Sequence, residues 1–319
     1  MTVVTLTVNP AVDLACSTHV VRPYHKIRTN IERIDAGGGG INVARVLRSL
    51  GEDVMALVMT GGVTGRMIEH LLDAADVPWR GIRIGEDTRI VINVREDESE
   101  LEYRFVPTGP AVGPEEWLTQ LDALSRVEAD WLVASGSLPP GVPDDFYARA
   151  ARIVHARGVR FALDTSRAGL RAALGCGVEL LKLSQSELEY LAGEELPNPA
   201  AQDEAVAALL AGGAAEMIAV SLGREGAMLA TREGIDRMPA IPVVVNGAVG
   251  AGDSFLAGLV YGLTRGLSRR EVLALAMATG AVAVSHFGTA HVTRDEVEAL
   301  YRRVMDGPFT EEELPATLA

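Results

Sequence analysis

Apolar residues along the chain occur in two patterns: short continuous runs, and segments in which they lie three and four positions apart. The second pattern is typical of amphipathic helices. From residue 114 to about 284 strand-like and helix-like segments alternate regularly. This alternation is typical of an α/β protein. The apolar runs that predict buried strands are residues 2–8, 54–59, 131–134, 161–164, 180–183 and 217–221.

Two stretches break the alternation. Residues 14–34 and 85–108 are β-like and carry no helical stripe. Within the second stretch, strands are expected at 88–95 and 101–106, and the polar turn between them predicts a hairpin. We interpret both stretches as a small β-sheet lid inserted into one domain. The core of that domain is predicted to comprise residues 1–13, 35–84 and 109–305, followed by an acidic tail at 306–319.

Composition and net charge narrow the range of possible binding partners. Hydrophobic residues make up 48% of the chain, which supports a sizeable core, and the net charge is −14. That charge disfavours nucleic acid and anionic membranes, and it requires any phosphate site to be locally basic. Cys16 and Cys176 are far apart, so we expect no disulfide and a cytoplasmic protein. No apolar run reaches membrane-spanning length, and no signal peptide precedes the first predicted strand.

The stretch Asn246-Gly247-Ala248-Val249-Gly250-Ala251-Gly252-Asp253-Ser254-Phe255 carries the clearest chemical signal. The apolar run 241–245 predicts a strand before it, and a helical pattern continues to about residue 266. A strand, a small-residue turn and a helix start form an anion site, because the first helical N–H groups have no intrahelical partner and the dipole is positive there. Gly247 and Gly252 have the spacing of a P-loop, but Asp253 stands in place of its lysine.

A carboxylate at this position suits a general base. We predict that Asp253 takes a proton from a hydroxyl that attacks a phosphate held by the N–H groups of Ala251, Gly252 and Asp253. The alternative is an ordinary helix start with Asp253 near the N-cap.

Near the N-terminus, a second set of residues suits ligand binding. Asp13 follows the first predicted strand, where open α/β sheets bind ligands, and it could hold sugar hydroxyls, although a turn aspartate is the alternative. The glycines 37–40 run into a helical pattern and would let a ligand lie against bare backbone. Asn42 offers a donor and an acceptor in the first helical turn. A flexible loop is the alternative, and the absence of a GxGxxG motif gives no support to a dinucleotide site.

Four basic residues stand out in this acidic chain because they fall in the two β-like stretches. A guanidinium fork suits bidentate phosphate binding, while solvated surface cations are the alternative for each residue taken singly. Separately, Ser184 with Glu187 three residues later predicts a helix capping box. The basic residues are Lys26, Arg28, Arg89 and Arg104.

Three motifs occur in order: the glycines 37–40 followed by Ile41-Asn42, the loop Ser135-Gly136-Ser137-Leu138-Pro139-Pro140-Gly141, and Gly250-Ala251-Gly252-Asp253. Together, over about residues 2–305, they resemble the ribokinase-type (PfkB) sugar kinase family. The resemblance implies a three-layer α/β/α core with a β-sheet lid that often pairs in a homodimer. It also implies ATP-dependent phosphorylation of a sugar hydroxyl, with Mg²⁺ and frequently a monovalent cation such as K⁺.

The resemblance also implies residue roles. Asp253 would be the base, and the anion hole would be formed by Gly250, Ala251 and Gly252. The sugar would be held by Asp13, Gly38, Gly39, Asn42 and Ser137. The nucleotide site would comprise Lys182, Ser184, Glu187, Ser221, Gly223 and Gly226, with Glu187 also holding Mg²⁺ through water. A K⁺ site would be formed by Gly247, Val249, Ala283, His286 and Gly288.

Within the family, the chain resembles the phosphosugar branch. Its cationic positions for the substrate phosphate correspond to Lys26, Arg28, Arg89 and Arg104. In 1-phosphofructokinases and tagatose-6-phosphate kinases a lysine usually occupies the third glycine position, whereas Gly39 matches 6-phosphofructokinases of the minor-isozyme type. We therefore predict conversion of fructose 6-phosphate to fructose 1,6-bisphosphate, with the other two activities as alternatives.

Three departures from the family pattern bear on this prediction. Ser184 replaces the asparagine of the Asn-x-x-Glu motif, which alters the expected Mg²⁺–water network. Ala248 replaces a threonine and Ala290 ends the cation loop, which puts K⁺ dependence in question. Ser184 keeps a catalytically weak sugar-phosphate sensor as an alternative, and a kinase for neutral sugars or nucleosides is another.

Overall fold

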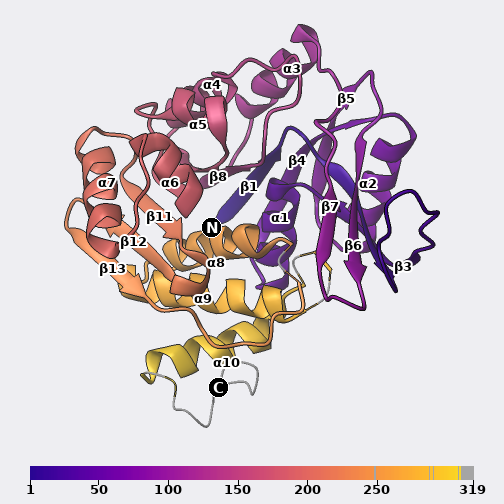
Figure 1. Cartoon of the computed structure of the whole chain (residues 1–319). Coiled ribbons are helices and arrows are strands. Elements are labelled where there is room, and N and C mark those ends of the chain that lie inside the picture. The colour runs from indigo at the N-terminus through magenta and orange to yellow at the C-terminus, as the bar shows by residue number, and fades with distance from the viewer. Residues whose placement is uncertain (248, 287, 290, 308, 310–319) are drawn as a thin grey trace.

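The computed structural model describes residues 1–247, 249–286, 288–289, 291–307 and 309. Within them, the main sheet has nine strands in the order β13-β12-β11-β10-β9-β8-β1-β4-β5 (Figure 1). All neighbours pair in parallel except β11 with β12 and β12 with β13. The strands are β1 (Thr2–Thr7), β4 (Asp53–Gly61), β5 (Trp79–Ile84), β8 (Trp131–Ser135), β9 (Arg160–Asp164), β10 (Leu180–Ser184), β11 (Met217–Ser221), β12 (Ala227–Thr231) and β13 (Gly234–Met238).

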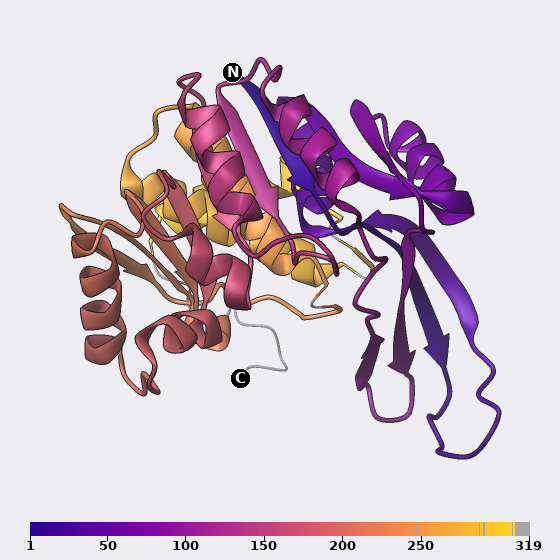
Figure 2. The ribbon, with the colours of Figure 1, turned by 90° about the horizontal axis from the view of Figure 1, so that it is seen from above.

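Helices cover both faces of this sheet (Figures 1 and 2). One face packs against α3 (Pro114–Leu124), α4 (Phe146–His155), α5 (Arg167–Ala173), α6 (Gln185–Ala192) and α7 (Pro199–Ala211). The other packs against α1 (Gly39–Ser49), α2 (Gly62–Ala74), α8 (Ala251–Thr264) and α9 (Arg269–Ser285), with α10 (Arg294–Met305) against α9.

The alternation of side chains along each strand explains the two cores. Trp131 and Val133 of β8 join the apolar cluster on the α1/α8 side, whereas Leu132 and Ala134 join the cluster on the other side. Both sets are fully buried, so strands with continuous apolar runs fill two layers at once. The predicted three-layer α/β/α core is therefore confirmed.

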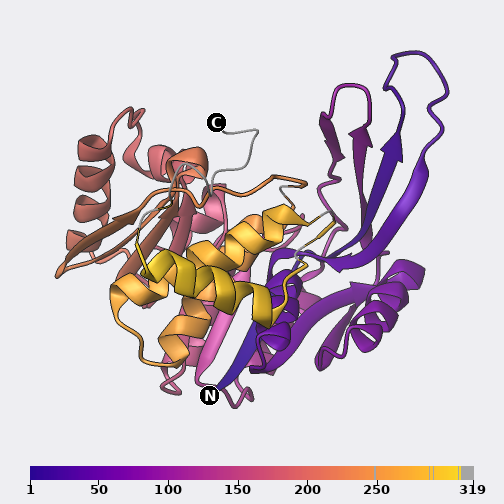
Figure 3. The same ribbon diagram turned by 90° about the horizontal axis from the view of Figure 1, so that it is seen from below.

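A second sheet has four strands within the described residues, in the order β3-β2-β6-β7. They are β2 (Ala11–Thr18), β3 (Asn30–Gly37), β6 (Arg89–Glu96) and β7 (Glu102–Phe105). The β6–β7 pair is the predicted hairpin, and β2 pairs antiparallel with β3 and parallel with β6. In Figures 2 and 3 this second sheet extends away from the main sheet, and the loop between β2 and β3 lies at its far end.

Two local predictions were wrong. Residues 241–245 form no strand before α8, because Pro242 removes a donor and no neighbouring strand pairs with them in the sheet as described. Val244 and Val245 are instead 50% and 66% exposed. Asp13 does not lie in a loop after the first strand; it lies inside β2, so the second sheet begins at Ala11.

Among the described residues, no helix combines the length and the apolar character that crossing a membrane requires. Ala248, Ala290, residue 308 and residues 310–319 fall outside the described part of the chain, and so do the predictions made for them.

Candidate active site

The site lies at one edge of the main sheet. Ser135, Asp164 and Ser184 are the last residues of the parallel strands β8, β9 and β10, and carboxyl ends of parallel strands meet at the same edge. The start of α8 lies at this edge as well, because Asp253 contacts Ser135. A cavity of about 210 Å³ opens there, lined by Gly39, Ser135, Gly136, Ser137, Asp164, Thr165, Ser166, Glu187 and Asp253.

The start of α8 has the form of an anion site. Gly250 precedes the helix at φ 79, a left-handed conformation that favours glycine. The first hydrogen bond of the helix runs from the Ser254 N–H to the Gly250 carbonyl oxygen at 2.8 Å. The N–H groups of Ala251, Gly252 and Asp253 therefore precede the hydrogen-bond ladder, where a helix binds anions.

Asp253 is fixed from two directions. Asn42, in the first turn of α1, donates from Nδ2 to Asp253 Oδ2 at 2.9 Å, and the Ser135 hydroxyl donates to Oδ1 at 3.1 Å. Gly39 closes a third side, because a Cβ there would lie 2.9 Å from Asp253 Oδ1 and 2.1 Å from Ser135 Oγ. The predicted base, Asp253, thus meets Asn42 and Gly39, which lie about 210 residues earlier in the sequence.

A buried ion pair faces the same cavity. Lys182 Nζ lies 3.0 Å from Asp164 Oδ2, and the two side chains are only 8% and 11% exposed. Burial acts to lower the pKa of Lys182, but the charge and hydrogen bond of Asp164, together with the charges of Asp253 and Glu187, raise it overall. A Cβ on Gly252 would lie 3.0 Å from Lys182 Nζ, so this ammonium group lies beside the start of α8. A fixed cation and the N–H groups that precede the hydrogen-bond ladder of α8 therefore converge on one point.

Asp13 lies on the second sheet and faces the core. Burial, followed by repulsion from Asp35, raises the pKa of Asp13 to about 6, while Arg89 and Arg104 act to lower it. Its carboxyl group packs on bare backbone, because a Cβ on Gly37 would lie 2.2 Å from Asp13 Oδ2. The structure therefore brings Asp13 together with two of the four predicted cations.

Lys26 and Arg28 are not brought to the same place. Both are exposed in the loop between β2 and β3, at the far end of the second sheet (Figure 3). Neither is among the groups that act on Asp13. Arg89, in contrast, donates to the Asn9 and Pro107 carbonyl oxygens, and Arg104 donates to Asn93 Oδ1.

The predicted nucleotide residues occupy adjacent strand ends. The capping box is confirmed, since Glu187 Oε2 accepts from the Ser184 N–H at 2.7 Å and from its hydroxyl at 2.8 Å. Ser221 ends β11 next to β10. Gly223 begins a short 3₁₀ turn, Gly223–Glu225, that Gly226 follows at φ 103. Ser221, Gly223 and Gly226 therefore surround the entry to β12, and β11 lies between β12 and the strand that carries Lys182, β10.

The predicted potassium residues also lie together. The Gly247 N–H donates to the Val284 carbonyl oxygen at 3.3 Å, and the His286 N–H donates to that of Ala283 at 3.4 Å. A Cβ on Gly247 would lie 3.4 Å from the His286 carbonyl oxygen. The His286 ring itself is engaged with Glu296 of α10 at 2.9 Å. Within the described part of this loop, backbone oxygens such as that of His286 are therefore candidate cation ligands.

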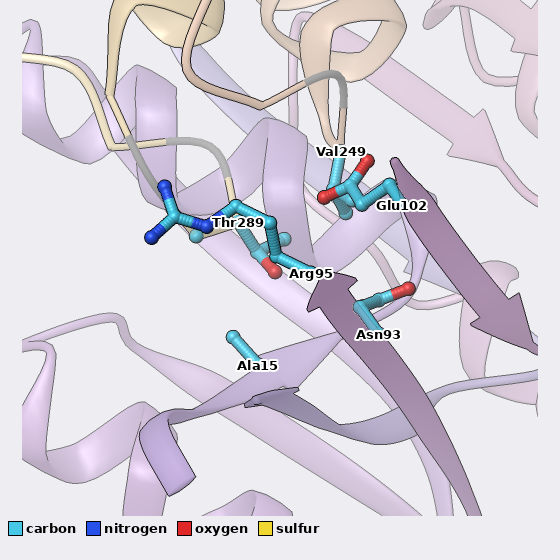
Figure 4. Close-up of a pocket in the computed structure, with 7 residues that line it drawn as sticks. Ala15, Asn93, Arg95, Glu102, Val249 and Thr289 are labelled. Carbon is cyan, nitrogen blue, oxygen red and sulfur yellow. The ribbon is translucent and has the colours of Figure 1, made fainter. Parts of the chain in front are cut away.

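The second sheet contacts the loops around α8. Val249, Gly288 and Thr289 face side chains from β2, β6 and β7 across a cavity of about 10 Å³, roughly the volume of one water (Figure 4). In Figure 4, Glu102 lies beside Val249, and Arg95 extends toward Thr289. The small volume means that the second sheet packs directly on the turn that precedes the anion site.

Sequence reasoning missed five residues of this site. Ser135 and Asp164 were noted only as parts of a loop and a strand, although their positions at strand ends were a usable signal. Asp35 is bound by Arg33 and by Arg45, and no motif marks any of these three residues.

Within the described residues, no cluster of three or more His, Cys, Asp or Glu side chains could hold a metal ion.

Comparison with known proteins agrees with this geometry. The profile of the pfkB family carbohydrate kinases matches residues 7–296. The chain is 43% identical over 301 residues to the ATP-dependent 6-phosphofructokinase isozyme 2 of Mycobacterium tuberculosis, covering 94% of this chain and 88% of that protein. It is 33% identical over 312 residues to the 1-phosphofructokinase of Escherichia coli, covering 96% and 98%.

Solved structures are similar as well. Phosphofructokinase-2 from Escherichia coli, in crystals with potassium and with fructose-6-phosphate, matches with TM-scores of 0.91 and 0.89 and identities of 32% and 31%, each covering 95% of this chain and 99% of that one. The similarity spans both sheets, since nearly the whole of each chain is aligned. By its sequence and its fold, the chain belongs to the pfkB family of carbohydrate kinases.

Proposed function

We propose that the protein transfers the γ-phosphoryl group of ATP to the C1 hydroxyl of fructose 6-phosphate. The observation that carries this proposal is the position of Asp253, a carboxylate fixed by Asn42 and Ser135 at the start of a helix with free N–H groups. An acid in that position can accept a proton while the neighbouring amides hold the transferred group.

The reaction then needs few protein groups. The C1 hydroxyl gives its proton to Asp253 as its oxygen bonds to the γ-phosphorus, and the bond from that phosphorus to the β–γ bridging oxygen breaks and releases ADP. Negative charge on the phosphoryl oxygens is stabilised by the N–H groups of Ala251, Gly252 and Asp253. Lys182 adds a fixed positive charge nearby. Proton removal by a positioned base contributes about 10²- to 10⁴-fold in rate.

The substrate is held mainly from the second sheet. Asp13 accepts hydrogen bonds from sugar hydroxyls, and Asn42 contributes its Oδ1, which is buried without a hydrogen-bond partner among the described residues. Arg89 and Arg104 supply positive charge for the sugar phosphate, and the Nε of Arg89 is also buried with no partner in the described part of the chain. At Gly39 the sugar can contact bare backbone, as in minor-isozyme 6-phosphofructokinases. The 1-phosphofructokinase and tagatose-6-phosphate kinase branches have a lysine at this position, so Gly39 favours fructose 6-phosphate as the substrate.

The residues present fit both metal ions. The N–H and the hydroxyl of Ser184 both donate to Glu187 Oε2, so Oε1 is left for water bound to a Mg²⁺ that would lie mainly on the ATP phosphates. Backbone oxygens around Gly247, Ala283, His286 and Gly288 suit a K⁺ ion, with Val249 in the adjoining turn. Mg²⁺ supplies charge neutralisation on the phosphates when bound.

We also propose a homodimer formed through the second sheet. One face of this sheet carries exposed apolar side chains, and β6 contributes two of them. An apolar sheet face of this kind is the usual site of association between subunits. The residues are Ile31, Ile90, Ile92 and Phe105, with exposed fractions of 60%, 40%, 38% and 57%.

A substrate panel tests the function. ADP release is measured with ATP, Mg²⁺ and fructose 6-phosphate, fructose 1-phosphate, tagatose 6-phosphate, fructose or a nucleoside, with and without K⁺. We expect the highest kcat/KM with fructose 6-phosphate, and a rise in its KM when Arg89 is replaced by alanine. Higher kcat/KM with a neutral sugar or nucleoside contradicts the phosphosugar proposal. A thermal shift with fructose 6-phosphate but no turnover indicates a sensor instead.

A further inference from the structure

Asp35 is a buried carboxylate that the proposed mechanism does not use. It lies on β3 directly opposite Asp13 of β2 in the antiparallel register, and each residue is 8% exposed. Directly opposed residues have Cβ atoms roughly 5 Å apart, and like charges there are destabilising. A second acid is therefore kept beside the one that we propose to bind sugar hydroxyls.

Two arginines hold Asp35 in place. Arg33, on the same strand, places its Nε 2.9 Å from Asp35 Oδ1 and 2.7 Å from Oδ2. Arg45 reaches Oδ1 from α1 at 3.3 Å, with a side chain only 12% exposed. Asn42, which donates to Asp253, lies one helical turn before Arg45. Asp35 therefore joins the second sheet to the helix that orients the proposed base.

The orientation of Asp13 depends on the same strand. Its carboxyl group packs on Gly37, two residues beyond Asp35, so closely that a Cβ there would lie 2.2 Å from Asp13 Oδ2. A shift of β3 would therefore move the carboxyl group of Asp13. The ion pair between Asp35 and Arg45 opposes such a shift, because it fixes β3 to the core.

The charge on Asp13 depends on Asp35 as well. Burial and then Asp35 raise the pKa of Asp13 to about 6, so the carboxyl group titrates near neutral pH. Arg45 and Asp13 also attract each other. The charged groups that face Asp13 are Asp35 of β3, Arg89 of β6, Arg104 of β7, Arg45 of α1 and Asp253 of α8.

We propose that Asp35 is a positioning residue of the sugar site: held by Arg33 and Arg45, it keeps Asp13 in place against Gly37 and sets the charge that Asp13 carries when the sugar binds. This inference rests on the proposed function, in which ionised Asp13 accepts hydrogen bonds from the sugar. It adds a residue that touches neither the sugar nor the nucleotide.

The test measures kcat/KM for fructose 6-phosphate as a function of pH and compares, across variants, the pH at which it falls on the acid side (the acid limb). Asp35→Asn removes the repelling charge, so Asp13 stays ionised to lower pH and the limb moves down by about one pH unit. Arg45→Gln removes an attracting charge, so the limb moves up. Ionisation of the substrate phosphate is the same in every assay, and a difference between variants therefore reports the protein.

Two controls separate this role from a structural one. Asp35→Glu keeps the charge and is expected to leave the limb at its wild-type position. Glu52→Gln removes another buried carboxylate, paired with Arg265 near the end of α8, and is also expected to leave it unchanged. A limb that stays in place in Asp35→Asn, or moves the same way in both charge variants, overturns the inference. If Asp35→Asn does not fold, the direction of the shift in Arg45→Gln decides.

A second measurement needs no turnover. In protein labelled with ¹³C-aspartate, the carboxyl signal of Asp13 is identified by its loss in Asp13→Asn and is titrated in wild type and Asp35→Asn. A lower midpoint in Asp35→Asn supports the inference, and an unchanged midpoint overturns it. Absence of turnover on every sugar, in contrast, contradicts the proposed function alone.

Discussion

Replacement of Asp253 by asparagine tests the proposed base most directly. Asparagine keeps the size of the side chain, so packing at the start of α8 is retained. One amide oxygen can still accept from the Ser135 hydroxyl, now 3.1 Å from Asp253 Oδ1. The new amide N–H₂ would face Asn42 Nδ2, but Asn42 can rotate its amide and accept through Oδ1, which has no other partner. We therefore expect little change in the unfolding temperature.

The rate is expected to fall far more than stability. An amide cannot accept the proton of the sugar hydroxyl, so the variant loses the contribution of general-base catalysis, about 10²- to 10⁴-fold. At 1.36 kcal/mol per factor of ten, this corresponds to about 3 to 5 kcal/mol in the activation free energy. The loss should appear mainly in kcat, because the sugar contacts at Asp13 and Gly39 are unchanged; rotation of Asn42 takes its Oδ1 away from the sugar and raises KM as well.

The assay is ADP release at saturating fructose 6-phosphate and ATP, with Asp144→Asn as the matched control because that carboxylate is exposed. A loss of kcat below about tenfold would refute the base assignment, since the required proton transfer would then occur without Asp253. A rise in KM with kcat unchanged would instead assign Asp253 to substrate binding.

Three further predictions follow from the packing. Gly39→Ala places a Cβ 2.1 Å from Ser135 Oγ and 2.9 Å from Asp253 Oδ1, so we expect kcat/KM to fall by about 10²-fold. In the control Gly85→Ala, the new Cβ lies 3.6 Å from its nearest neighbour, and kcat/KM should not change. Lys182→Met leaves Asp164 buried without its partner and should lower the free energy of unfolding, measured in urea, by about 3–5 kcal/mol. Adding Asp164→Asn to the same chain should restore much of this loss. An equal loss in the double variant would contradict the ion-pair argument. Ile92→Asp should convert a dimer to a monomer in sedimentation, whereas Leu118→Asp, on α3 and 49% exposed, should not; a monomeric wild type would rule out the dimer.

The sequence predicted what depends on local pattern. The strands of the main sheet have continuous apolar runs because both of their faces are buried, and the helix starts at Gly39 and Ala251 follow glycine turns. Residues 241–245 show where local pattern fails. Their β-branched side chains suit a strand, but a strand also needs a partner, and the sequence does not state which edges of a sheet are free.

The candidate site was predictable where a motif carried it. Asp253, Asn42 and Gly39 were found in this way, and they meet in the structure. Asp35 was not found, because its importance depends on the register of β2 with β3, which places it opposite Asp13. Lys26 and Arg28 were grouped with Arg89 by charge and by the family resemblance, and neither signal indicates that the loop carrying Lys26 and Arg28 lies at the far end of the second sheet.

The carboxylate proposed to bind the sugar and the one proposed to accept its proton belong to different parts of the protein. Asp13 lies on β2 in the second sheet, whereas Asp253 begins α8 in the core. In the proposed mechanism the second sheet supplies Asp13, Arg89 and Arg104 to the sugar site while the core supplies the base, so substitutions in the second sheet can change the sugar preference and leave the base in place. A library of substitutions confined to β2, β3, β6 and β7 offers a direct route to kinases for other phosphosugars, because the parts that handle ATP stay as they are.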